Sequence, residues 1–152
     1  MSANQGEIGY LHLPPGAEPP TLSIGPFKAV MILEAEHSNE WRNTISHWLV
    51  ASGCRYMMAW GVESSEWDNS VDWASIEACG WDVDVDLDDD RFVMTTWHDK
   101  ETLASVFWFA GFCAGHATLD LETLLIDVGP SPREAALRAA YQAALLADPD
   151  EL

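Results

Sequence analysis

Positive charge is scarce in this sequence. Only 7 of its 152 residues are Lys or Arg, against 25 Asp and Glu, so the formal net charge is −18 at pH 7. Contacts with nucleic-acid phosphates need Lys and Arg, which argues against direct binding of DNA or RNA. An excess of negative charge keeps a protein soluble, and it also steers and orients a basic partner. We therefore expect no direct nucleic-acid binding and, as the partner, a basic protein.

Long apolar runs and paired cysteines are also lacking. No stretch reaches the roughly 18 apolar residues of a membrane span, and the N-terminus lacks the basic flank and apolar run of a secretion signal. Cys54, Cys79 and Cys113 are odd in number and have no CxxC spacing, so we expect reduced thiols in the core. These features predict a cytoplasmic protein that does not bind membranes.

The sequence contains no glycine-rich phosphate loop and no complete calcium loop. Carboxylates follow the first apolar run, at 34–39, where a nucleotide-binding loop has glycines and a Lys, so we expect no cofactor. In the Asp-rich segment 81–90, alternate positions are acidic, as at the start of an EF-hand. In a loop that starts at Asp82, however, Leu87 takes the place of the required Gly, so no metal site is predicted.

Short apolar runs alternate with helical patterns along the chain. Strands are predicted at 28–34, 55–60, 91–97 and 123–128, with a helix after each of them. This alternation with short connections requires right-handed crossovers and a mainly parallel sheet. The predicted fold class is α/β: a small three-layer flavodoxin-like sandwich with helices on both faces of a mainly parallel four- or five-stranded sheet. The fifth strand would come from the Asp-rich segment, if that segment joins an edge.

Three of the expected helices have marked sequence signals. Ser38 is the expected N-cap of the first helix, and Ser131 the expected N-cap of the last one, in a capping box with Glu134. The helix at 102–114 is so apolar that we expect it to be buried on most sides.

The chain divides into an arm, one domain and a tail. Residues 1–26 hold five of the eight prolines, so this Pro-rich N-terminal arm should be extended or irregular. A single α/β domain is expected at 27–147, followed by an acidic tail at 148–152. The last predicted helix, 131–147, has one apolar face, and a homodimer through this face is an alternative to packing on its own domain.

Tryptophan is abundant, with eight residues in the chain. Five of them lie around the second predicted helix and the neighbouring strand ends, close to the Asp-rich segment. An aromatic anchor within a charged rim is typical of a protein-binding hot spot. The alternatives are a second core against the helix for the Trp side chains and a solvated face for the Asp side chains. The expected partner-binding residues are Trp67, Trp73, Trp81, Asp82, Asp84, Asp86 and Asp88.

The two hypotheses for function belong to different classes. The favoured one is a non-enzymatic acidic protein-binding module, of the inhibitor or immunity type, that engages a basic partner. The other is a small hydrolase or nucleotide-processing enzyme with an acidic and His-containing site at the carboxyl ends of the strands, where open parallel sheets bind ligands. Its candidate acid–base groups are Glu34, His98, Asp99 and Asp127, for which helix capping is the alternative role.

Three short strings resemble a sequence family. They are Tyr-Met-Met-Ala-Trp-Gly at 56–61, Ser-Ser-Glu-Trp-Asp-Asn-Ser-Val-Asp-Trp-Ala at 64–74 and Val-Met-Thr-Thr-Trp-His at 93–98. In these strings the chain is similar to an uncharacterised bacterial family of domains of unknown function, over about residues 27–128. The arm and the last helix lie outside this resemblance, which implies a bacterial or phage setting and supplies no activity.

Overall fold

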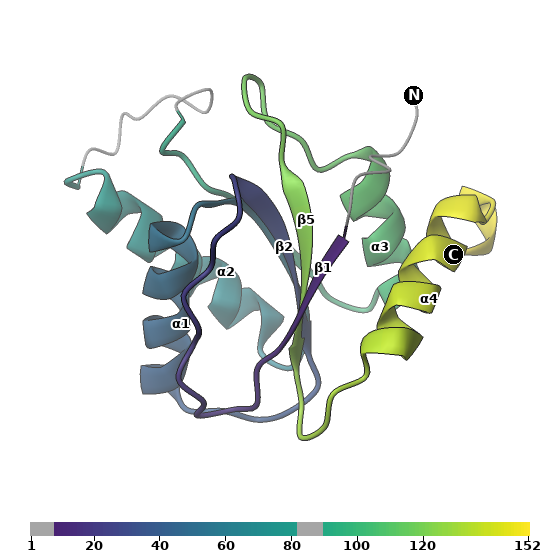
Figure 1. Ribbon diagram of the computed structural model, residues 1–152, viewed down its shortest axis with the longest axis horizontal. Coiled ribbons are helices and arrows are strands. Elements are labelled where there is room, and N and C mark those ends of the chain that lie inside the picture. The colour runs from purple at the N-terminus through teal and green to yellow at the C-terminus, as the bar shows by residue number, and fades with distance from the viewer. Residues whose placement is uncertain (1–7, 82–89) are drawn as a thin grey trace.

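The structure is a computed structural model that describes residues 8–81 and 90–152 (Figure 1). The strands are β1 (Ile8–His12), β2 (Phe27–Leu33), β3 (Cys54–Gly61), β4 (Met94–His98) and β5 (Glu122–Val128). The helices are α1 (Asn39–Ala51), α2 (Ser64–Ala78), α3 (Leu103–Phe112) and α4 (Glu134–Leu146), followed by a short 3-10 helix, Pro149–Glu151. No helix in the described parts of the chain is both long and apolar enough to cross a membrane.

The five strands form one parallel sheet in the order β1-β5-β2-β3-β4. All seven residues of β2 at its centre are buried, which explains why this strand has a continuous apolar run rather than alternation. The predicted parallel arrangement of the four apolar runs is confirmed. The fifth strand is β1, from the N-terminal arm, whereas the Asp-rich segment lies mainly outside the described residues.

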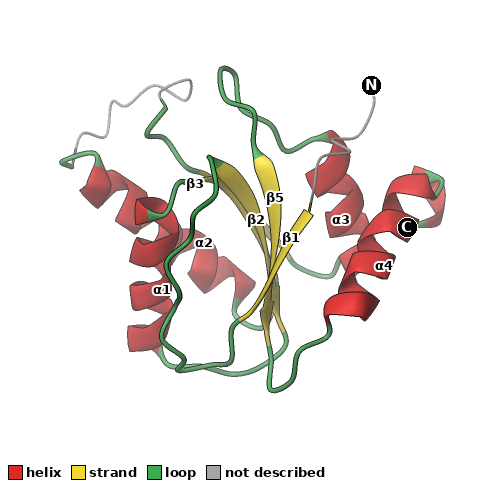
Figure 2. Ribbon diagram, in the orientation of Figure 1, coloured by secondary structure: helices red, strands yellow, loops and turns green. Residues whose placement is uncertain are grey.

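Helices cover both faces of the sheet (Figure 2), as the predicted three-layer α/β sandwich requires. On one face, α1 and α2 pack on the β2 side chains Ala29, Met31 and Leu33. On the other face, α3 and α4 pack on Val30 and Ile32. Alternate β2 side chains thus supply two separate cores, because successive residues of a strand point to opposite faces.

The N-terminal arm takes the place of a helix on the first of these faces. After β1, Leu13 is buried and the arm runs along α1 toward the start of β2 (Figure 1). The indole N–H of Trp41 donates to the Ala17 carbonyl (2.9 Å), and that of Trp48 to the Pro20 carbonyl (2.8 Å). The described part of the arm, residues 8–26, contributes a strand and core residues to the domain that was expected to begin at residue 27.

Three local predictions are wrong. Helix α3 is buried on one side only, and Trp108, Phe109 and Phe112 are half-buried, because an outer-layer helix contacts the sheet along a single face. Helix α4 begins at Glu134, and its first turn receives no side-chain cap from Ser131. Cys113 is exposed at the end of α3, whereas Cys54 and Cys79 are buried as expected.

Candidate functional site

The sheet order reverses between β2 and β5, and this switch point is where doubly wound sheets bind ligands. The connection after β2 leads to α1 on one face, and the connection after β5 leads to α4 on the other (Figure 1). Glu34 directly follows β2, and Asp127 is the penultimate residue of β5. Two of the four predicted acid–base residues therefore stand beside the switch point.

Arg133 joins these two carboxylates. Its Nη1 donates to Glu34 Oε2 (2.7 Å) and its Nη2 to Asp127 Oδ1 (2.6 Å). The Asp127 side chain is fully buried, and its other oxygen accepts a hydrogen bond from the Tyr10 hydroxyl (2.7 Å). The Tyr10 oxygen in turn accepts from the backbone N–H of Arg133 (2.9 Å). This network ties β1, β5, the β2–α1 connection and the start of α4 to one another.

The contacts of this network raise the pKa values of Arg133 and Tyr10. Hydrogen bonding to Asp127 is the main cause that raises the pKa of Arg133. Burial, followed by the hydrogen bond to Asp127, raises the pKa of Tyr10. Arg133 donates to both carboxylates, and Tyr10 donates to the second oxygen of Asp127. The switch-point network therefore acts as a structural tie.

His98 and Asp99 stand apart from the switch point. His98 ends β4, and β3 lies between β2 and β4. The backbones at Glu34 and His98 are thus separated by two strand spacings, roughly 10 Å. Asp99 is exposed in the turn that follows β4. The four predicted acid–base residues consequently do not converge on one reacting atom.

His98 has acid–base partners of its own. Its Nε2 lies 2.9 Å from Thr96 Oγ1, and its Nδ1 lies 2.9 Å from Glu101 Oε2. The ring is buried and packs edge-on against Phe109, with ring centroids 5.2 Å apart. Hydroxyl, imidazole and carboxylate therefore form a linear chain of hydrogen bonds, which we call the Thr96 relay. Sequence reasoning selected Asp99 as the carboxylate, but the turn after β4 presents Glu101 instead.

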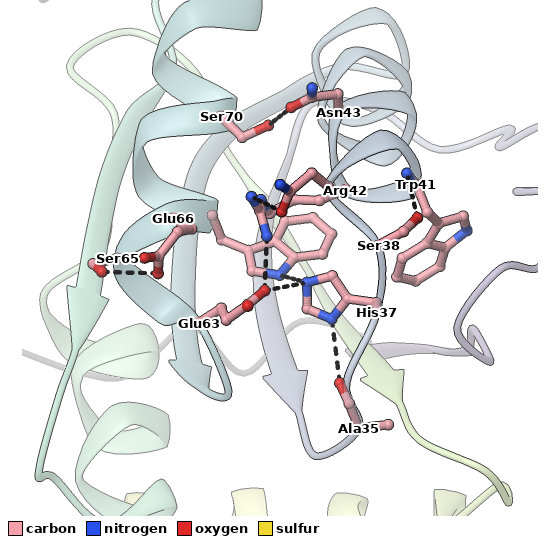
Figure 3. A network of polar contacts seen from close by, with 12 residues as sticks. Ala35, His37, Ser38, Trp41, Arg42, Asn43, Glu63, Ser65, Glu66 and Ser70 are labelled. Atoms are coloured by element: carbon pink, nitrogen blue, oxygen red, sulfur yellow. Dashed lines mark hydrogen bonds and ion pairs between the residues drawn. The ribbon is translucent and has the colours of Figure 1, made fainter.

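A second polar network lies at the β2–α1 and β3–α2 connections and the first turns of α1 and α2 (Figure 3). Glu63 Oε2 accepts from Arg42 Nη1 (2.8 Å) and lies 3.4 Å from His37 Nε2. The His37 ring is fully buried between Trp41 and Trp67, with centroid distances of 5.7 and 5.3 Å. Sequence reasoning missed this network, although His37 and Glu63 each follow a predicted strand and that position was a usable signal.

The hydrogen bond from Trp67 determines the tautomer of His37. The Trp67 indole N–H donates to His37 Nε2 (2.9 Å), so the proton of the neutral ring is on Nδ1, which donates to the Ala35 carbonyl (3.2 Å). The backbone of Glu63 has a φ of 55°, in the left-handed region that is uncommon for residues other than Gly. This network orients Glu63, whose side chain is 43% exposed, and it holds α1 against α2.

The predicted partner-binding tryptophans separate into buried and exposed side chains. Trp67 is 0% exposed, so its predicted role as a surface anchor is wrong: the α2 face that carries it points into the core. Trp73 and Trp81 are 62% and 59% exposed, and their ring centroids lie 6.3 Å apart. Trp97 on β4 is a third exposed ring, at 51%. The predicted acidic positions Asp82, Asp84, Asp86 and Asp88 lie outside the described residues.

The end of α2 brings Trp81 to Trp73. The backbone N–H of Gly80 donates to the Glu77 carbonyl (3.0 Å) and that of Trp81 to the Ile76 carbonyl (2.9 Å), the two bonds of a Schellman motif with Gly80 in the left-handed position. Trp81 is also left-handed, with a φ of 65°. For a bulky residue this conformation costs about 1–2 kcal/mol. The backbone of Trp81 is thus strained, although its side chain is mostly exposed to solvent.

Several of the seven cationic side chains are buried or paired within the protein. Lys28 and Arg42 are buried. The Lys28 ammonium donates to the Ala110 and Ala114 carbonyls at the end of α3, and burial lowers its pKa. Arg133 pairs with two carboxylates, and Arg138 pairs with Glu134 (2.9 Å). These four cations are thus engaged within the described parts of the chain.

Within the described ranges, no group of three or more His, Cys, Asp or Glu side chains has the arrangement of a metal site.

Comparison with sequence families assigns the chain to a family. A family model for a domain of unknown function, DUF7684, matches residues 8–144. The chain belongs to this family. No curated protein and no solved structure matches the sequence.

The DUF7684 match is wider than the resemblance found in three short strings, because it includes β1, the arm and most of α4. The structure gives the physical reason. β1 pairs with β5 along five residues, and α4 covers the same face of the sheet as α3, so neither can be removed without exposing core. The DUF7684 domain is the whole α/β sandwich, including the arm.

Proposed function

We propose that this chain is a non-enzymatic acidic protein-binding module, of the inhibitor or immunity type, that engages a basic protein. The observation that carries this proposal is the Trp73–Trp81 pair, two mutually contacting and mostly exposed indole rings on an acidic chain. Aromatic anchors surrounded by a polar rim provide most of the binding energy in many protein interfaces.

The charge of the molecule supports a basic partner. Glu66 and Glu77 are exposed on α2 at either side of Trp73, and Asp90 is exposed at the end of the Asp-rich segment. A negative surface raises the rate of encounter with a positive one, and it disfavours acidic partners. The free thiols Cys54 and Cys79 and the bacterial family resemblance support a bacterial cytoplasmic setting for this binding.

Binding kinetics test the proposal. The purified chain retrieves its partner from host lysate, and the partner is then produced alone and measured by surface-based kinetics at low and high salt. Trp81→Ala should speed dissociation, because it removes an anchor. Replacing Asp84, Asp86 and Asp88 together with Asn should slow association roughly three- to ten-fold at low salt, with little effect at high salt.

A variant of equal charge controls for the total charge. Asp148→Asn, Asp150→Asn and Glu151→Gln together remove three negative charges from the C-terminal segment, which is remote in sequence from the Asp-rich segment. This control should leave association near that of the parent chain. If both triple variants slow association equally, the local acidic rim is not the steering element. If neither Trp81→Ala nor the Asp84, Asp86 and Asp88 variant changes any rate, the proposed interface is wrong.

A second candidate function, a small hydrolase, is favoured by the Thr96 relay. When Nδ1 of neutral His98 carries the proton, it donates to Glu101. The lone pair of Nε2 then accepts the hydrogen bond from the Thr96 hydroxyl. This is the order of groups that activates a hydroxyl nucleophile in acyl transfer. Thr96 lies on β4, an edge strand of the sheet, and its side chain is only partly buried.

The reaction would proceed in two balanced steps. Thr96 Oγ1 attacks the carbonyl carbon of an ester while its proton passes to His98 Nε2, and the departing alcohol then takes this proton. Water repeats the sequence on the acyl-Thr96 ester and releases the carboxylic acid. Glu101 stabilises the imidazolium that forms in each step.

Hydrolysis of p-nitrophenyl acetate tests this second candidate. Thr96→Val and His98→Gln should each lower the rate at least about 100-fold, as expected for loss of a nucleophile or a general base. Thr95→Val and His47→Gln are the controls, since Thr95 bonds to Asp72 on the opposite face and His47 is an exposed imidazole. A rate that survives Thr96→Val, or that falls equally with His47→Gln, excludes the relay as a catalyst.

A further inference from the structure

Trp73 and Trp81 are held in a defined arrangement while most of their surface stays in water. The rings are tilted by 53° at a centroid separation of 6.3 Å, so they form an open angle rather than a stack. The left-handed Trp81 and the Schellman motif at Gly80 fix the second ring beside the first. Residues in sparsely populated backbone conformations cost free energy and persist only where the surrounding structure holds them. They are concentrated at active sites and ligand sites.

The surroundings of the pair select the charge of its ligand. Glu77 lies one helical turn beyond Trp73 on α2, where its carboxylate pairs with His47 Nε2 of α1 (2.5 Å) and its side chain is 49% exposed. The faces of indole rings carry negative potential and attract cations within about 6 Å of the ring centroid. The two ring faces therefore disfavour an anion and favour a cationic group.

We propose that the Trp73–Trp81 pair is a binding site for one cationic side chain, the guanidinium of Arg or the ammonium of Lys, presented by a basic protein partner. This inference rests on the proposed protein-binding function and names the group that the interface recognises. The planar guanidinium stacks on one indole while its edge meets the other, and the negative potential of the ring faces attracts its charge. A neutral side chain of the same shape gains no such attraction.

A peptide titration measured by NMR tests the site. The probes are three blocked tripeptides, Gly-X-Gly, in which X is arginine, lysine or citrulline, the neutral analogue of arginine. In a 15N-labelled chain, the indole N–H signals of Trp73 and Trp81 should shift with the arginine and lysine peptides, and the side-chain protons of the peptide should move upfield. The indole signal of Trp97, which is also exposed, should not shift.

Matched variants separate stacking from bulk electrostatics. Trp73→Leu and Trp81→Leu keep the net charge, and each should weaken binding of the arginine peptide about three- to ten-fold. Trp97→Leu should leave its affinity unchanged. Equal shifts with the citrulline peptide, equal shifts at Trp97, or unchanged affinity in the Trp73→Leu and Trp81→Leu variants would each overturn the inference.

The protein partner distinguishes failure of this site from failure of the proposed function. If the double variant Trp73→Leu and Trp81→Leu loses the arginine peptide but dissociates from the basic partner at the parental rate, the pair is not the recognition element, while the protein-binding function stands. If the pair binds the arginine and lysine peptides and the chain retains no basic protein, the cation site stands and the protein-binding function fails. Faster dissociation of the partner from the double variant supports both.

Discussion

A methyl group at Gly61 would collide with the backbone of the neighbouring strand. Gly61 ends β3 with a φ of 106°, and a Cβ at this position would lie 2.2 Å from the Leu33 carbonyl oxygen. Ordinary van der Waals contact begins near 3.4 Å, so β2 or β3 would have to move by more than 1 Å. The same carbonyl accepts a hydrogen bond from the backbone N–H of Val62 (2.8 Å), which this movement would break.

Gly53 provides a matched control for the backbone conformation. Its φ is 103°, but the nearest atom to an added Cβ would be 3.9 Å away. Gly53→Ala therefore introduces only conformational strain, about 1–3 kcal/mol. Gly61→Ala adds the lost hydrogen bond, about 1 kcal/mol, and overpacking of about 1–3 kcal/mol. We expect Gly61→Ala to lower the free energy of unfolding by at least about 2 kcal/mol more than Gly53→Ala.

Urea unfolding, followed by tryptophan fluorescence and far-UV circular dichroism, measures this difference. For a chain of this length, each 1 kcal/mol corresponds to a change in Tm of about 2–4 °C. A Gly61→Ala chain that does not fold agrees with the prediction. Equal free energies of unfolding for the two variants would refute it, because they would mean that β2 and β3 do not approach as closely at Gly61 and Leu33 as described.

Further predictions concern ionisation, thiol reactivity and helix capping. Burial lowers the pKa of Lys28 in the folded chain below its ordinary 10.5, so between the folded and the unfolded pKa the unfolded chain binds more protons. The free energy of unfolding should therefore rise with pH in this interval by up to about 1.4 kcal/mol per pH unit. Urea unfolding of the parent chain and of Lys28→Met measures this difference. Cys113 is exposed and should react quickly with a thiol reagent in the folded chain. Burial raises the pKa of Cys54 to about 12, so Cys54 should react only on unfolding. Equal reaction rates for the two thiols would contradict the described exposures. Ser38→Ala should destabilise the chain by about 1 kcal/mol through loss of the α1 cap, while Ser131→Ala should change stability by less than about 0.5 kcal/mol, and a reversed order would contradict the described caps.

The local pattern of the sequence accounts for most of the predicted elements. Continuous apolar runs located β2 and β5 to within a residue, because a strand covered on both faces has no polar side. Ser38 does cap α1, as predicted, since capping depends on residues within one turn. Alternation of strands and helices predicted the parallel sheet, because crossovers through helices impose it.

The candidate sites were only partly predictable. Glu34 and Asp127 were correctly placed beside the carboxyl ends of their strands, but only the folded chain shows that Arg133 occupies both. Glu101 was missed as the partner of His98 because the conformation of a short turn decides whether a side chain points back or out. Asp99, nearer to His98 in sequence, is exposed instead.

The sequence by itself determined the α/β class, the acidity, the abundance of Trp and the positions of the main strands, because these depend on composition and on contacts between near neighbours. Tertiary structure alone decided the role of β1, whose partner β5 begins more than one hundred residues later. It also decided which indoles are free. Trp67 and Trp73 are on the same helix, six residues apart, yet one is buried under His37 and Trp41 and the other meets Trp81 in solvent. Packing against segments that are distant in the sequence decides which of the two indoles is buried, and the local sequence pattern does not contain that information.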